Sequence, residues 1–184
     1  MKNKPDQAIL ERAKRFEAQA LEEIFDTFSP GIYRYAYRLI GDEELAKECM
    51  SETFSRFLVA LKRKRGPKAY LQAYLYQIAH NWVTDYYRSK TPPTLPLAED
   101  LPADQEDSPS EQLAVKMSNQ HVRRALSLLT PDQRQVITLK FLEDWENEAI
   151  ARSMNKPLGA VKALQHRGLE ALRRILNRNE DDHV

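Results

Sequence analysis

The sequence predicts an all-α protein of two small helical domains joined by a flexible acidic linker, and three observations indicate this fold class. Apolar residues recur at three- and four-residue steps through most of the 184 residues, as they do along amphipathic helices. Glycine is scarce, with only five residues. A stretch rich in proline and acidic residues divides the chain at 91–112. We therefore expect one domain over 8–90, the linker over 91–112, and a second domain over 113–178.

The first domain is expected to begin with two helices. An apolar stripe runs from Leu10 to Phe28 at helical spacing and predicts the first helix. Ser29 and Pro30 then resemble an N-cap followed by proline at the first helical position. Gly41 closes the second stripe, since glycine commonly follows a helix C-terminus.

Two further helices complete the first domain. Asp42 stands at the N-cap position of a third helix, whose apolar stripe ends at Leu61. A basic loop, KRKRGPK at 62–68, interrupts the pattern. The fourth helix is expected to bury a stripe that starts at Leu71, and to end near Arg88.

The second domain shows a different set of helical signals. Thr130 and Gln133 stand three residues apart ahead of an apolar run, which is the pattern of a capping box. The helix that this box opens is expected to carry Val136, Ile137, Lys140 and Phe141. The other expected elements are a helix around 111–128, a short helix near 147–154, a turn at 155–157 and a long helix to about 177.

The charge is distributed unevenly along the chain. Residues 1–90 contain 16 Lys and Arg against 12 Asp and Glu, and residues 113–178 contain 12 against 6. The 22 residues at 91–112 contain six acids, five prolines and no basic residue. Such a segment cannot bury enough apolar surface to offset the entropy of ordering. Two basic bodies therefore flank an acidic connector.

Several classes of protein are disfavoured by composition. With Cys49 as the single cysteine, no intrachain disulfide can form, and we expect this residue to belong to the core. The chain has no run of 18 apolar residues and its first residues are too charged for a signal peptide, so we expect a cytoplasmic protein without membrane insertion. No phosphate-binding Gly-rich loop occurs. The four histidines lack the spacing of metal ligands, so we expect no metal, no cofactor and no enzyme: His80, His121, His166 and His183.

The segment SMNKPLGAVKALQHRG, 153–168, has the outline of a helix-turn-helix, whose second helix enters the major groove of DNA. Small residues near the start of that helix allow a close approach to phosphates. The inner positions would be Leu158, Val161, Leu164, Gly168 and Leu172; the outward ones would be Lys162, Ala163, His166, Arg167 and Arg173. The alternative is a helical hairpin with a solvated basic side.

The fourth helix carries a second candidate surface for nucleic acid. Tyrosine rings stack on unpaired bases and amides read base edges, while basic side chains follow phosphates. Residues of these kinds recur at helical spacing and in the preceding loop: Lys64, Arg65, Lys68, Tyr70, Tyr74, Gln77, Asn81 and Arg88. The alternative is that the tyrosines fill the core of a helix bundle.

Three segments in order resemble bacterial sigma factors of the sigma-70 family, in the extracytoplasmic-function (ECF) group. AKECMSETF (46–54) is similar to the family's core-polymerase-binding segment, and AYLQAYLYQIAHNWVTDYYR (69–88) to the segment that melts and reads the −10 promoter element. LTPDQRQVITLKFLEDWENEAIARSMNKPLGAVKALQHRGLEALR (129–173) resembles the region that reads the −35 element.

The resemblance assigns roles to three groups of residues. The polymerase contact would include Glu48, Ser51, Glu52 and Phe54. The eight residues from Lys64 to Arg88 named above would take the single-stranded −10 element. The −35 duplex would contact Lys156, Gly159, Ala160, Lys162, Ala163, His166 and Arg167.

The function that follows from the resemblance is that of an alternative sigma factor. It would bind core RNA polymerase and promoter DNA, and the family commonly has an anti-sigma partner. The alternative is a stand-alone helix-turn-helix repressor or activator that binds duplex DNA without polymerase. An enzyme acting on nucleic acid is disfavoured because no cluster of carboxylates or histidines is present.

Overall fold

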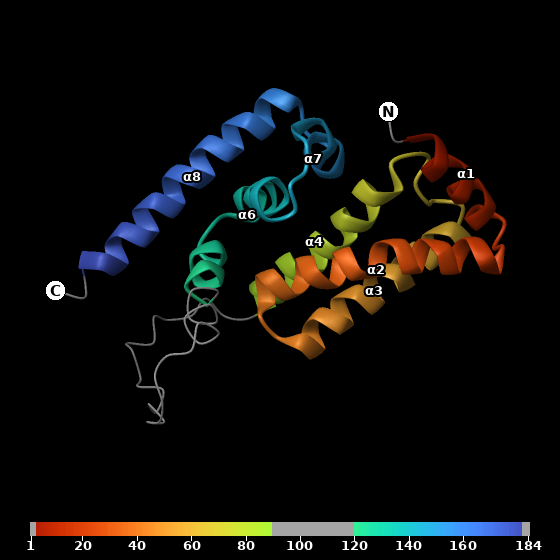
Figure 1. Ribbon diagram of the computed structural model, residues 1–184, viewed down its shortest axis with the longest axis horizontal. Coiled ribbons are helices and arrows are strands. Elements are labelled where there is room, and N and C mark those ends of the chain that lie inside the picture. Colours follow the sequence, from red (N-terminus) through yellow and green to blue (C-terminus); the bar gives the residue numbers. More distant parts are fainter. Residues whose placement is uncertain (1–2, 90–119, 182–184) are drawn as a thin grey trace.

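The computed structural model describes residues 3–89 and 120–181, and every regular element within these ranges is a helix (Figure 1). The predicted all-α class is therefore confirmed. The linker expected at 91–112, and the start of the helix expected at 111–128, lie outside the described residues. The chain from residue 120 to residue 127 is helical, in agreement with the rest of that expectation.

The first body is a bundle of α1 (Asn3–Lys14), α2 (Ala18–Ile40), α3 (Glu43–Lys62) and α4 (Leu71–Ser89). These helices bury one another's apolar stripes, and this burial is the main driving force for their association. The fully buried side chains of this bundle include Leu10, Ile24, Ile32, Tyr35, Leu39, Phe57, Leu71, Leu75 and Val83.

The predicted helix boundary at Ser29–Pro30 is wrong. α2 runs through Pro30 without a break, and the chain turns instead between α1 and α2, where Phe16 has a φ of 59°. Proline inside a helix removes one backbone hydrogen bond. The helix continues because Ile24 and Ile32, on either side of the proline, are both buried in the bundle.

The predicted ends between α2 and α3 are confirmed. Gly41 has a φ of 79°, which a residue with a side chain rarely adopts, and its N–H donates to the Tyr37 carbonyl at 2.8 Å. The Asp42 carboxylate accepts from the Leu45 N–H at 3.0 Å and caps α3.

The second body contains the helical segment 120–127, α6 (Pro131–Ile137), a π-helical turn η1 (Thr138–Leu142), α7 (Asn147–Met154) and α8 (Leu158–Asp181). The predicted capping box is present. The Thr130 hydroxyl accepts from the Gln133 N–H at 3.4 Å, and the Gln133 side-chain oxygen accepts from the Thr130 N–H at 3.3 Å.

Two large apolar residues of the second body are exposed, and one of them, Leu158, was expected to face inward. Phe141 is 53% exposed, because the wide π-helical turn rotates it away from the side that Val136 and Ile137 occupy. Leu158 is 36% exposed, since it stands at the first residue of α8, ahead of the turns that pack on α6. The predicted inward positions Val161 and Leu164 are buried.

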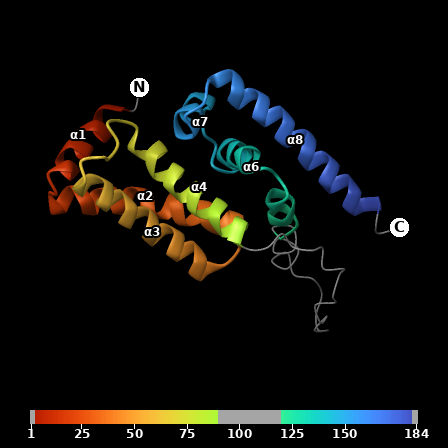
Figure 2. The ribbon, with the colours of Figure 1, turned by 180° about the vertical axis from the view of Figure 1, so that it is seen from behind.

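The two bodies touch through α4 and α7. Figures 1 and 2 both place α8 along the outer side of the molecule, with α6 and α7 between it and the first bundle. One continuous cluster of buried residues extends from the first body into the second. α8 is thus held at a distance from α2 and α3.

Candidate nucleic-acid interface

The turn between α7 and α8 is built by local backbone bonds. Asn155 takes a left-handed conformation with a φ of 51°, which ends α7, and asparagine tolerates this conformation better than most residues. The Lys156 N–H donates to the Ala151 carbonyl at 3.0 Å. Pro157 follows, and its carbonyl accepts from the Val161 N–H at 3.1 Å, in the first turn of α8. These hydrogen bonds fix the turn between α7 and α8, so the two helices have the arrangement of a helix-turn-helix.

The inner side of α8 packs closely on α6. A Cβ atom added to Gly168 would lie 2.9 Å from Cγ1 of Ile137, so glycine is needed for this approach. The Glu146 side chain makes no capping bond at the start of α7, which therefore depends on packing such as that of Ile150, 0% exposed.

The outer side of α8 is open to solvent. Lys162, Ala163, His166 and Arg167 are all exposed, as the helical spacing predicts. A Cβ added to Gly159 would meet no atom within 4 Å, so the structure has no internal reason for a small residue at this position. The surface can accept a close external partner here.

Two other predicted duplex contacts are less accessible. Lys156 is half-buried and its ammonium group lies 3.1 Å from the Asp132 carboxylate of α6. Ala160 is also half-buried. The most available groups for duplex DNA are therefore on the next turns of α8.

The residues predicted for single-stranded DNA are divided between α4 and the loop before it. Gln77, Asn81 and Arg88 are exposed along one side of α4, although Arg88 pairs with Asp85 at 3.2 Å. Tyr70 lies just before α4, with its φ at 55°. A bulky residue in this conformation is uncommon, and the surrounding structure must hold it there.

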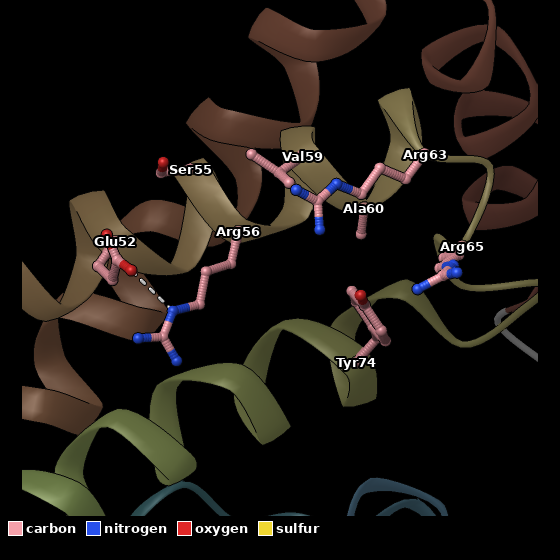
Figure 3. Close-up of a pocket in the computed structure, with 8 residues that line it drawn as sticks. All are labelled: Glu52, Ser55, Arg56, Val59, Ala60, Arg63, Arg65 and Tyr74. Atoms are coloured by element: carbon pink, nitrogen blue, oxygen red, sulfur yellow. Dashed lines mark hydrogen bonds and ion pairs between the residues drawn. The ribbon is translucent and has the colours of Figure 1, made fainter.

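Tyr74 lines a groove between α3, the basic loop and α4, with a volume of about 340 Å³ (Figure 3). Its ring packs edge-on against Phe57, with centroids 6.4 Å apart, and partial burial raises the pKa of its hydroxyl. Arg63 and Arg65 project toward the groove from the end of α3 and the loop. The groove thus combines an aromatic wall with positive charge.

Of the remaining loop residues, Lys64 and Lys68 are exposed, and the Lys68 carbonyl accepts from the Gln7 side chain at 3.0 Å. Sequence reasoning missed Arg56, which lines the same groove from α3 and pairs with Glu52 at 2.7 Å. Arg56 and Arg63 lie seven residues apart, or two helical turns, so helical spacing could have placed them on one side.

The residues predicted to bind polymerase do not all reach the surface. Glu48 and Ser51 are exposed on α3, and Glu52 is half-buried. Phe54 is only 8% exposed and its ring centroid lies 4.8 Å from that of Phe25, so it presents little surface to a partner, and its contact with polymerase stays a prediction. Phe54 belongs to the apolar stripe of α3, so its side chain points into the bundle.

The exposed apolar residues near Phe54 are therefore better candidates for a protein contact. Phe25 of α2 is 42% exposed, and Leu58 of α3 is 39% exposed. A second apolar surface lies on the second body, a groove of about 190 Å³ whose lining includes Val122, Phe141 and Leu169. The second body therefore has an apolar surface in addition to its basic one.

The buried reactive groups have structural roles. His80 lies between Tyr35, whose hydroxyl is 3.0 Å from Nδ1, and Thr84, whose hydroxyl is 3.2 Å from Nε2. Burial, together with the positive charge of Arg134, lowers the pKa of His80 to about 4. Burial raises the pKa of Cys49 to about 12, so its thiol is un-ionised at neutral pH.

Among residues 3–89 and 120–181, no three His, Cys, Asp or Glu side chains gather where they could hold a metal ion. A separate search of these residues finds no helix with the length and apolar character needed to cross a membrane.

Comparisons with known proteins find one family model in each of the two bodies. Residues 24–92 match the family model described as Sigma-70 region 2, and residues 120–172 match that of Sigma-70, region 4. The first match contains the groove and α4, and the second contains α7 and most of α8.

Curated relatives match over most of the chain. It is 34% identical over 174 residues to the ECF RNA polymerase sigma factor BldN of Streptomyces coelicolor, covering 91% of this chain and 64% of BldN. It is 28% identical to the ECF RNA polymerase sigma factor SigW of Bacillus subtilis, covering 91% of this chain and 94% of SigW. The chain thus spans slightly less than two thirds of BldN and nearly all of SigW.

The fold is similar to that of CnrH, whose structure was solved in complex with the cytosolic domain of CnrY. The TM-score is 0.69 at 18% identity, over 94% of this chain and 97% of CnrH. The sigma factor RpoE from Bartonella quintana, solved with the anti-sigma factor NepR, has a TM-score of 0.58 at 18% identity, over 85% of this chain and 96% of RpoE.

Proposed function

Because the chain belongs to the sigma-70 family, in its ECF group, we propose that it is an alternative sigma factor that directs core RNA polymerase to particular promoters. The observation that carries this proposal is the presence of two surfaces with different nucleic-acid chemistry on one chain. One is an open helix suited to duplex DNA, and the other is a cationic, aromatic groove suited to unpaired bases.

The duplex-reading surface is the outer side of α8. Lys162, His166 and Arg167 are exposed and can reach base edges in the major groove of the −35 element. Gly159, at the start of the helix, leaves room for a phosphate beside the helix N-terminus. Lys156 and Ala160, which are half-buried, would support the turn that positions these groups.

The base-capturing surface is the groove beside Tyr74 together with the exposed side of α4. A base taken from the −10 duplex would stack on the tyrosine ring, at roughly 1–3 kcal/mol per base. Arg65 and Lys68 would hold the phosphates, while Gln77 and Asn81 offer amides to base edges. Stabilising the displaced bases would favour the melted state of the promoter over the duplex.

Core polymerase would bind α3 and the neighbouring part of α2. Glu48 and Ser51 provide exposed polar groups, and Phe25 and Leu58 provide apolar area for the contact. The functional domains would extend over 8–90 and 113–178. The acidic segment 91–112 would pass through a basic channel of polymerase made for nucleic acid.

The polymerase, and not this chain, would make the new bonds of the transcript. A protein with this task works in the cytoplasm, where polymerase and promoter are found. An anti-sigma partner is a further part of the proposal, in view of the complex of RpoE with the anti-sigma factor NepR.

The test is co-migration of the purified chain with bacterial core RNA polymerase on a sizing column, without DNA and at moderate salt, followed by run-off transcription. A stoichiometric complex is expected. Failure to associate, together with tight binding to duplex DNA alone, would favour a stand-alone helix-turn-helix regulator.

The polymerase-binding surface can be tested by charge reversal. Glu48→Arg should weaken association with core polymerase about tenfold, because it places a basic group where the surface presents an acid. Glu148→Arg, at an exposed position of α7 in the second body, is the matched control and should have little effect. Equal losses from both variants would contradict the assignment of this surface to α3.

A further inference from the structure

Three arginines converge on the groove beside Tyr74. Arg56 and Arg63 reach it from α3, and Arg65 reaches it from the basic loop (Figure 3). Among the described residues that line the groove, Glu52 is the only acid. The groove therefore presents an excess of two positive charges within about 340 Å³. A cluster of cations this dense favours an anion that carries more than one charge.

The backbone that carries Arg65 is held in one conformation before any ligand binds. The Arg65 N–H donates to the Ala60 carbonyl at 2.8 Å, and Lys64 takes a left-handed φ of 55°. A Cβ atom added to Gly66 would lie 2.6 Å from Cδ2 of Leu61, so the loop lies closely against the end of α3. A loop fixed in this way loses little entropy when a ligand binds its side chains.

The charges of the three arginines are only partly compensated. Arg63 and Arg65 are exposed, and neither forms an ion pair with an acid in the part of the chain that the structure describes. Arg56 pairs with Glu52 at 2.7 Å, but a solvent-accessible pair one helical turn apart contributes little to stability. Arg56 can therefore leave Glu52 for an anion of higher charge. Such an anion would also relieve the repulsion among the three guanidinium groups.

A free nucleotide with several phosphate groups matches this charge better than one nucleotide of a DNA strand does. A DNA strand carries one negative charge per nucleotide. A nucleoside diphosphate carries about three negative charges on two joined phosphate groups. Guanidinium groups bind phosphate oxygens through two parallel N–H donors, so arginine is well suited to this contact. The three arginines thus indicate a ligand with at least two phosphate groups.

Tyr74 supplies a wall for the base of such a ligand. Its ring packs edge-on against Phe57, with centroids 6.4 Å apart, so packing holds its orientation. The side chain is half-buried and lines the groove. Stacking on a tyrosine accepts any base, because every base has a π-face. The groove volume lies at the lower end of the range of small-molecule sites, about 300–1,000 Å³, which suits a ligand as small as a mononucleotide.

We propose that the groove is a binding site for free nucleoside polyphosphates, with the base on Tyr74 and the phosphate groups on Arg56, Arg63 and Arg65. A bound nucleotide would occupy the ring on which a displaced −10 base stacks, so the two ligands exclude each other. Promoter melting would then fall as the nucleotide concentration rises. This competition rests on the proposed sigma function, whereas nucleotide binding by the free chain does not.

Calorimetric titration of the intact free chain tests the site, with ADP, pyrophosphate and adenosine as separate ligands and without divalent cations. ADP should bind at least about fivefold more tightly than pyrophosphate, because stacking adds to the charge contacts. Adenosine should bind at least about tenfold more weakly than ADP, because it has no phosphate group. Equal affinities for ADP and either partial ligand, or no binding of ADP at about 1 mM, would overturn the site.

Two variants separate the phosphate contact from the base contact. Arg63→Gln should weaken the binding of ADP and of pyrophosphate alike, by about tenfold. Tyr74→Leu, which keeps apolar packing against Phe57, should weaken ADP to nearly the affinity of pyrophosphate and leave pyrophosphate binding unchanged. A loss of pyrophosphate affinity in Tyr74→Leu as large as its loss of ADP affinity would overturn the base contact.

The matched control is Lys62→Gln. Lys62 is an exposed basic residue next to Arg63, and its side chain does not line the groove. The variant should change neither affinity by more than about twofold, because solvent and salt screen a charge outside the site. Equal losses from Lys62→Gln and Arg63→Gln would indicate attraction to a diffuse basic surface and would overturn the site.

Open-complex assays test the competition, with ADP as the competitor because RNA polymerase does not incorporate it into the transcript. On a promoter that the chain transcribes with core polymerase, ADP should lower the permanganate reactivity of the melted −10 segment. With Arg63→Gln, the same inhibition should need about tenfold more ADP. Inhibition at the same ADP concentration in both proteins would assign the effect to the polymerase and overturn the competition, as would no inhibition. If the chain does not bind polymerase, the sigma function fails, while the titrations still decide whether the groove binds nucleotide.

Discussion

The two candidate DNA-binding surfaces differ in how many parts of the chain build them. The duplex-reading surface belongs to one helix, α8, and its exposed residues follow from helical spacing alone. The base-capturing groove needs α3, the basic loop and the start of α4 together. A substitution within α8 should therefore affect only the duplex-reading surface. A substitution in the packing between α3 and α4 should disturb the groove, which several elements build together.

Acid should produce the largest effect, through the buried side of α4. His80 has its pKa lowered to about 4, so the unfolded chain binds its proton more readily than the folded chain does. Stability from the neutral His80 is fully present above pH 6.5, is lost progressively as the pH falls from 6.5 to about 4, and levels off below that, with a total loss of about 3 kcal/mol. Urea unfolding at several pH values measures this loss.

The control for the acid effect is His80→Gln, which removes the titrating group from the same cluster of Tyr35 and Thr84. This variant should show a flatter dependence of unfolding free energy on pH between 6.5 and about 4. An unchanged dependence would assign the acid sensitivity to other groups.

The inner side of α8 should tolerate added volume poorly. Gly168→Leu should destabilise the fold by about 2 kcal/mol, because the new side chain would overlap Ile137 on α6. Thermal unfolding measures the change. Ala163→Leu, exposed on the outer side of the same helix, is the control, and a comparable loss there would contradict the distinction between the two sides.

The groove should depend on the ring of Tyr74. Tyr74→Ala should lower open-complex formation on duplex promoters about tenfold, since it removes the stacking wall, whereas Tyr74→Phe should retain most activity. A promoter with an already melted −10 segment should reduce the defect of the alanine variant. Equal defects on both templates would indicate loss of packing against Phe57 and not loss of base capture.

The smallest effect on stability is expected at the start of α8. A substitution there should change stability and DNA binding in opposite directions. Gly159→Ala should stabilise the fold by about 0.5–1 kcal/mol, because alanine favours helix and its Cβ meets no atom within 4 Å. The same methyl group should lower −35-dependent initiation, which run-off assays on promoters with and without a −35 element can measure. Improved stability with unchanged initiation would place the DNA farther from Gly159.

Local signals predicted much of the fold. The caps at Asp42 and Thr130, the end at Gly41 and the helix at 147–154 were predicted because each depends on residues close in sequence. The boundary at Pro30 was predicted wrongly, because a local proline signal was outweighed by burial on both sides of it. The π-helical turn at Thr138–Leu142 was not predicted, because helical spacing does not anticipate it.

The sequence by itself determined the helical class and the outward side of α8, because these depend on spacing within one helix. Its resemblance to the sigma-70 family rested on three motifs in order, which the comparisons support. Only the tertiary structure decided that Arg56 joins the groove beside Tyr74 and that Glu143 meets Arg38. These relations join residues from different helices, and their geometry depends on how the helices pack.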